Sequence, residues 1–78
     1  MARLAELDRA VLTASFPEDG LEPGDVGTVV YVHADGCAYE VEFVMLDGRT
    51  VAVVTAEASQ VRPVGGRDIT HARQLTVP

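Results

Sequence analysis

Residues 26–43, with the sequence VGTVVYVHADGCAYEVEF, predict two β-strands joined by a tight turn. Asp35-Gly36 is the strongest short hairpin signal in the chain, because these residue types tolerate the backbone angles of a tight turn. Apolar and acidic residues alternate after the turn, which indicates a strand with one buried face. The buried side chains would be those of Tyr39, Val41 and Phe43, and the outward ones those of Glu40 and Glu42.

Turn signals divide the rest of the chain at short intervals, as in all-β barrels and sandwiches. Valine is the dominant apolar residue, with thirteen copies, and its branched Cβ favours strands. We therefore expect an all-β fold, a small five-stranded SH3-like barrel over residues 9–64, with a lead-in of residues 1–8 and a C-terminal tail of residues 65–78. The expected strands cover residues 9–15, 26–33, 38–46, 50–55 and 60–62.

The two ends of the chain carry weaker signals. Residues 2–8 could form one helical turn with Leu4 and Leu7 on one side, although so short a helix is not stable alone. In the tail, Ile69, Ala72 and Leu75 are spaced three apart. This spacing suits a short docked helix, so we expect the tail to be either helical or extended.

The composition is that of an ordinary globular domain, since the 78 residues are 47% hydrophobic and 23% charged. Twelve acidic residues stand against six arginines and no lysine, and the net charge of −6 argues against unassisted binding to a phosphate backbone. No apolar run approaches the roughly 18 residues that cross a bilayer, and we expect no membrane partner. The single Cys37 fits a reducing cytoplasm, which is the expected location.

Charge is unevenly distributed along the chain. Residues 1–60 contain eleven acidic residues and three arginines, for a net charge of −8. Residues 61–78 contain three arginines and one aspartate, for a net charge of +2. The basic tail could therefore dock on the acidic part of the same chain, dock on a neighbouring subunit, or remain solvated.

Two segments, Gly24-Asp25-Val26-Gly27-Thr28-Val29-Val30 and Tyr39-Glu40-Val41-Glu42-Phe43, resemble blocks of a family of small bacterial proteins, domain-of-unknown-function family 4926. The likeness covers roughly residues 6–64. It implies an SH3-like barrel but no established activity, cofactor or catalytic residue. Such proteins also look like ones encoded in mobile gene cassettes. The Gly-Asp-Val-Gly block is similar, in addition, to the glycine-centred turn of ribosomal and transcription-factor barrels that touch RNA.

Candidate catalytic and metal-binding groups gather around the predicted hairpin turn. His33, Asp35 and Cys37 could meet there as a nucleophile, a base and an orienting group, but a hairpin tip offers no pocket that excludes water. With the distant His71 they supply four metal donors, yet without the short paired spacing of structural zinc sites. We interpret them as turn residues and expect no enzymatic activity, no metal and no cofactor.

The most informative feature is a surplus of apolar residues on the third and fourth strands. Val51 and Val53 alternate with Ala52 and Val54, so both strand faces are apolar, and a second layer should cover one of them. The cover could be the tail, a second copy of the chain or a foreign protein. Our leading hypothesis is a non-enzymatic module that self-associates or binds a protein partner, and that Val54→Glu would dissociate. The candidate interaction residues are Val44, Leu46, Ala52, Val54, Ile69 and Leu75.

Glu40 and Glu42 form an acidic surface on the third strand. We interpret them as a solvated face, with Arg49 as a cross-strand partner, or alternatively as a docking surface for a basic protein. The alternative function is weak, regulatory nucleic-acid binding by the tail. That function would use Arg62, Arg67 and Arg73, and its affinity would fall steeply with salt.

Overall fold

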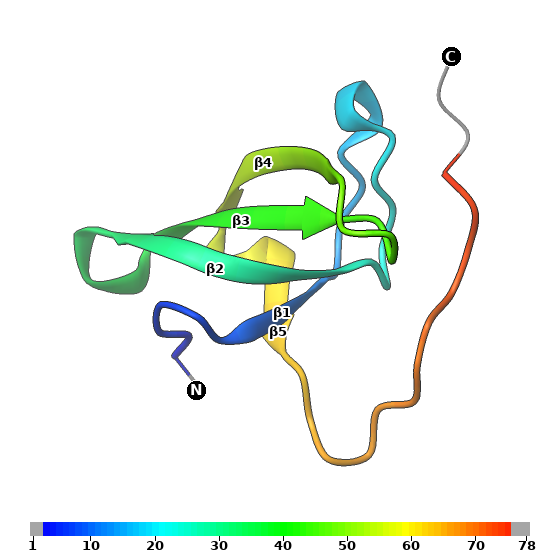
Figure 1. Cartoon of the computed structure of the whole chain (residues 1–78). Helices are drawn as coiled ribbons and strands as arrows, with labels where there is room; N and C mark the ends of the chain where they lie inside the picture. Colours follow the sequence, from blue (N-terminus) through cyan, green and yellow to red (C-terminus); the bar gives the residue numbers. More distant parts are fainter. Residues whose placement is uncertain (1–2, 76–78) are drawn as a thin grey trace.

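The computed structural model describes residues 3–75 and contains one antiparallel sheet with the strand order β4-β3-β2-β1-β5 (Figure 1). The expected all-β class and the number of strands are confirmed. In the described part of the chain no ladder joins β4 to β5, so the sheet stays open between these two edge strands. The strands are β1 (Arg9–Leu12), β2 (Val26–His33), β3 (Ala38–Val44), β4 (Thr50–Glu57) and β5 (Val61–Pro63).

Short 3-10 turns lie in three of the connections: η1 (Pro17–Asp19), η2 (Ala34–Gly36) and η3 (Ala58–Gln60). The η2 turn differs from the expected two-residue hairpin, because Ala34, Asp35 and Gly36 all have positive φ angles. Four residues therefore separate β2 from β3. No helix among the described residues is long and apolar enough to cross a membrane.

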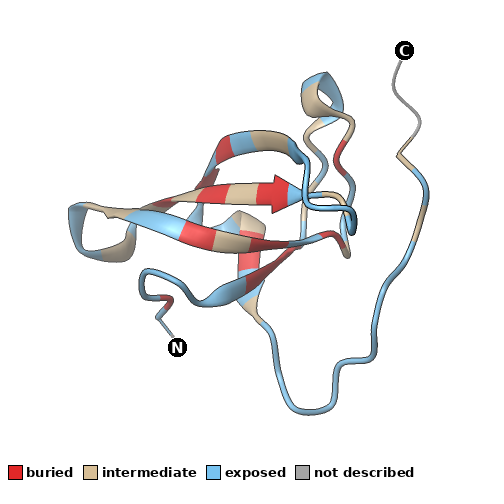
Figure 2. Cartoon of the chain, viewed as in Figure 1, coloured by how far each residue is buried: buried red, intermediate tan, exposed pale blue. Residues whose placement is uncertain are grey.

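All five strands of the bent sheet contribute buried residues to the core (Figure 2). The predicted alternation of β3 is confirmed, since Tyr39, Val41 and Phe43 are buried and the residues between them are not. Leu12, Val29 and Val41 are the largest side chains that are fully buried. These three side chains, one each from β1, β2 and β3, belong to one continuous hydrophobic cluster.

The lead-in does not form the helical turn predicted for residues 2–8, of which residue 2 lies outside the described part. Leu4 is buried, whereas Leu7 is 78% exposed and has a φ of +74°. The Asp8 carboxylate accepts a hydrogen bond from the amide of Ala5 at 2.8 Å, and the amide of Asp8 donates to the carbonyl of Ala5 at 3.0 Å, so residues 5–8 form a single turn and not a helix. The amide of Leu7 donates instead to the carbonyl of Val29 in β2.

Of the two forms expected for the tail, helical and extended, the structure has the extended one. It leaves β5, bends away from the sheet and returns along one side of the molecule towards the loop before β2 (Figure 1). Ile69 is 91% exposed, so it does not cover the apolar strands as the tail hypothesis required. Leu75 is half-buried.

Candidate interaction sites

The outer face of β2, β3 and β4 carries a small polar network. Glu40 accepts hydrogen bonds from the Thr55 hydroxyl at 2.7 Å and from the His33 ring at 2.6 Å. These bonds, first that of Thr55 and then that of His33, lower the pKa of the Glu40 carboxyl below its ordinary value. The ring of Tyr31 lies edge-on to the His33 ring, with centroids 4.8 Å apart.

The prediction that Arg49 pairs with the acidic surface across the strands is wrong. Arg49 binds Asp47 in its own turn at 2.9 Å, because the two side chains flank Gly48. Glu42 accepts a hydrogen bond from the Thr50 hydroxyl at 3.3 Å instead. The carboxylates of the outer face therefore accept hydrogen bonds from two threonine hydroxyls and one histidine ring of the same sheet, and not from an arginine.

The structure corrects which residues of β4 face outwards. Val54 is only 5% exposed and belongs to the core, whereas Val53 is 51% exposed on the outer side. Phe43 pairs with Ala52 and Val44 with Thr50, which leaves Val51 as an extra residue where the register shifts. Val54→Glu would therefore put a charge in the core and cannot test an interface. Ala52 is half-buried, and Val44 and Leu46 are exposed as expected.

The two edges of the sheet differ in how they are protected. β5 has only three residues, ends in Pro63 and carries an arginine, three features that discourage pairing with another strand. β4 has eight residues, contains no proline, lysine or arginine, and has its only charge at Glu57. Among the described residues β4 pairs with β3 alone, so its other edge is open to a further strand.

The predicted trio of the hairpin turn is not assembled. The His33 ring binds Glu40 on the outer face, whereas Asp35 and Cys37 line a half-open hollow next to the lead-in and β5. No group of three His, Cys, Asp or Glu side chains among the described residues could hold a metal ion. The other residues that line the hollow include Arg3, Leu4, Tyr39, Val61 and Arg62.

The base of the tail is closed by an ion pair. Arg62 binds both carboxylate oxygens of Asp68 at 2.9 Å, and the amide of Gly65 donates to the same carboxylate at 2.6 Å. These contacts, first that of Arg62 and then that of Gly65, lower the pKa of Asp68 to about 2. One of the three arginines of residues 61–78 is thereby neutralised by an aspartate of the same segment.

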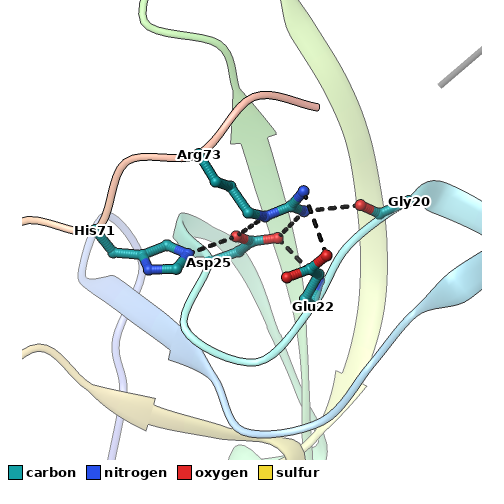
Figure 3. Close-up of polar contacts among 5 residues, drawn as sticks. All are labelled: Gly20, Glu22, Asp25, His71 and Arg73. Carbon is teal, nitrogen blue, oxygen red and sulfur yellow. Dashed lines mark hydrogen bonds and ion pairs between the residues drawn. The ribbon is translucent and has the colours of Figure 1, made fainter. Parts of the chain in front are cut away.

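The end of the tail is anchored at the loop before β2 (Figure 3). Asp25 is 8% exposed, and the Arg73 guanidinium donates to both of its oxygens, at 2.8 Å from Nε and 2.5 Å from Nη2. Nη2 also donates to the carbonyl of Gly20 at 2.8 Å. His71 lies 3.2 Å from Asp25, and Glu22 lies 3.6 Å from Arg73. We call these five residues the tail-docking site.

The loop is shaped to receive both side chains. A Cβ at Gly24, whose φ is +98°, would lie 3.3 Å from the His71 ring, so the ring rests on a position that has no side chain. Burial raises the pKa of Asp25, but hydrogen bonds from Arg73 and from the amide of Glu22 outweigh it, and the pKa lies below its ordinary value. The carboxylate is thus charged at neutral pH and matched by the tail.

Sequence reasoning did not assign Asp25, His71 or Arg73 to one site. Its only pointer was the contrast in net charge between the acidic body and the basic tail. Of the three outcomes left open for the tail, docking on the same chain is the one observed. The contact joins residues 46 and 48 positions apart, and no local pattern announces such a pair.

The comparisons with known proteins agree with the extent of the sheet. The model of the family described as "Domain of unknown function (DUF4926)" matches residues 6–63, which include all five strands. No curated protein and no solved structure matches the chain.

Proposed function

The chain belongs to the family of domain of unknown function DUF4926, and we propose that it acts as a non-enzymatic interaction module that self-associates through the free edge of β4. The observation that carries the proposal is the eight-residue, nearly uncharged edge strand. Such an edge presents unpaired amide and carbonyl groups, which a second strand satisfies. A second copy of the chain supplies a strand of identical length and character.

An antiparallel pair of β4 strands has a two-fold axis, and charge favours one position for it. With the axis at Val53, the central pairs are Val53 with itself and Ala52 with Val54. The same register brings Arg49, which precedes β4, towards Glu57 at the end of the partner β4. Opposite charges then meet at both ends of the pairing. Arg49 is free to respond, since its side chain is 75% exposed in its pair with Asp47.

Packing of two outer faces against each other is less favourable. Glu40 and Glu42 lie on that face, and a two-fold arrangement would bring the carboxylates of both copies together. Nucleic-acid binding by the tail is also less favourable, because Arg62 and Arg73 are already paired with Asp68 and Asp25. Edge pairing by β4 needs none of these groups to change partners.

The non-enzymatic character of the module is supported by its side chains. Cys37 is exposed, and the ring of His33, the base predicted for it, is directed to Glu40 on another face. A nucleophile without an adjacent base is poorly activated. A single exposed thiol also suits a reducing compartment, and we place the protein in the cytoplasm.

The test is the mass of the protein in solution. We expect the chain to elute as a dimer, with about twice its mass of 8.3 kDa, and Val53→Asp to convert it to a monomer. Two carboxylates would then oppose each other at the axis. The free energy of unfolding should fall by about 1 kcal/mol, because position 53 is half-exposed but lies opposite Glu42 in β3, a like charge.

The control is Val64→Asp, which adds the same charge at a valine of similar exposure, 42%, beyond β5. This variant should remain dimeric. A wild-type chain that stays monomeric at high concentration, or a Val53→Asp chain that dimerises as well as Val64→Asp, would refute the proposal.

A further inference from the structure

We propose that the tail-docking site is exchangeable, and that Asp25 of one copy accepts the Arg73 side chain from the tail of a second copy. The inference deepens the proposed self-association, on which it rests for the meeting of two copies. It adds a second contact, made by a different part of the molecule. The tail seen on its own body is then one of two occupants of the same site.

The site requires a cation whichever chain supplies it. Asp25 is buried, and without the tail its only hydrogen bond from the described residues comes from the amide of Glu22 at 2.9 Å. A buried carboxylate that loses its partner is strongly destabilised. The Gly20 carbonyl accepts a hydrogen bond from the guanidinium of Arg73, and the position of Gly24, which has no side chain, leaves room for the ring of His71. The site therefore fits a segment that has a planar ring two residues before an arginine.

Among the described residues the tail is the segment that fits the site, and its exchange between copies has a low net cost. Residues 64–70 are exposed and include Gly65-Gly66, and their hydrogen bonds at Asp68 are formed within the segment and with Arg62. Transfer of His71 and Arg73 to another copy would break their contacts with Asp25 and Gly20, and these contacts form again on that copy. This is the low-cost route to association that exchanged segments provide.

The reach of the tail and the charges of the two parts are also suitable. Fully extended, residues 64–70 would span roughly 23–25 Å, comparable to the 21 Å short dimension of the molecule, and this span requires the turn at residues 65–68 to open. Residues 1–60 carry a net charge of −8 and residues 61–78 a net charge of +2. The tail is therefore attracted to the body of any copy that edge pairing brings near.

The first experiment is complementation between two variants. Asp25→Asn keeps the tail but lacks the acceptor, and Arg73→Ala keeps the acceptor but lacks the guanidinium. Neither variant can form the pair alone, whereas their mixture can form it between copies. The exposed Cys37 takes a donor dye in one variant and an acceptor dye in the other. The mixture is measured with and without Val53→Asp in both variants, so that exchange within an edge-paired dimer is distinguished from exchange that does not need edge pairing.

The second experiment measures the site directly with a fluorescent peptide of residues 67–78. We expect it to bind full-length Arg73→Ala, whose site is vacant, at least about tenfold more tightly than Asp25→Asn/Arg73→Ala. Binding to the wild-type chain should be weaker than to Arg73→Ala, because the resident tail competes.

Each experiment can overturn the inference. Energy transfer in the mixture should exceed that between donor-labelled and acceptor-labelled copies of Asp25→Asn, which cannot form the pair, and equal transfer would exclude a second copy as the donor of the arginine. Equal binding of the peptide to Arg73→Ala and to the double variant would show that Asp25 accepts no tail in trans. A monomeric wild-type chain would refute edge pairing but not tail exchange, because energy transfer and peptide binding can still be measured.

Discussion

Two glycines of the Gly24-Asp25-Val26-Gly27 block have separate structural roles. Gly24 provides the surface on which the His71 ring rests. Gly27 is fully inside the sheet, where a Cβ would lie 2.7 Å from the carbonyl oxygen of Glu42 and 2.8 Å from the Phe43 ring. The first glycine serves the tail, and the second allows β2 and β3 to pack closely around the core.

Gly27→Ala should therefore destabilise the fold. The nearest obstacle is a backbone oxygen of β3, which cannot move without distorting the ladder, and overpacking of this kind costs about 1–3 kcal/mol. The free energy of unfolding is measured by urea denaturation. Gly66→Ala is the matched control, because a Cβ there meets nothing within 4 Å, and it should be nearly neutral. Equal stability of the two variants would contradict the packing argument.

At the scale of elements, the strands could be predicted because alternation and turns are local signals. The outward phase of β4 could not, since residues 51–54 are all apolar and the register shift at Val51 changes which of them faces the core. The tail-docking site was missed for a different reason. Its carboxylate and guanidinium are far apart in sequence, and only the folded sheet brings them together. Charge contrast predicted that the tail could dock but not where.

The register proposed for β4 makes a further prediction. Arg49→Glu would place two acids together at each end of the paired strands and should weaken dimerisation by about two- to fivefold, the effect of an exposed charge pair. Adding Glu57→Arg reverses both partners and should restore the affinity. Dimer dissociation is measured by sedimentation at low salt, where screening is weak. A double variant that dimerises no better than Arg49→Glu would place the two-fold axis elsewhere.

At the scale of the whole molecule, the sheet and the tail are held by different forces. The sheet buries a continuous apolar cluster, whereas the described tail contributes no residue to that cluster. Its attachment depends on ion pairs and hydrogen bonds, of which the best shielded are those at Asp25. The tail should therefore detach under conditions that leave the sheet folded, which is the property that exchange requires.

Acid is one such condition, and the sign follows from the lowered pKa of Asp25. A carboxyl whose pKa is lower in the docked form stabilises docking above its ordinary pKa of 3.8 and loses this contribution as the pH falls through the docked value. The charged or titratable groups that face it are Arg73, His71 and Glu22. We expect the Gly24 amide and Arg73 Nε resonances to keep their docked values near pH 7 and to move towards free values only as the pH falls below 3.8. The Val41 amide, in the core, reports whether the sheet is still folded.

The control is Asp25→Asn, which should show weaker docking and no acid transition. Release of the wild-type tail near neutral pH would mean that the Asp25 carboxylate does not hold the tail.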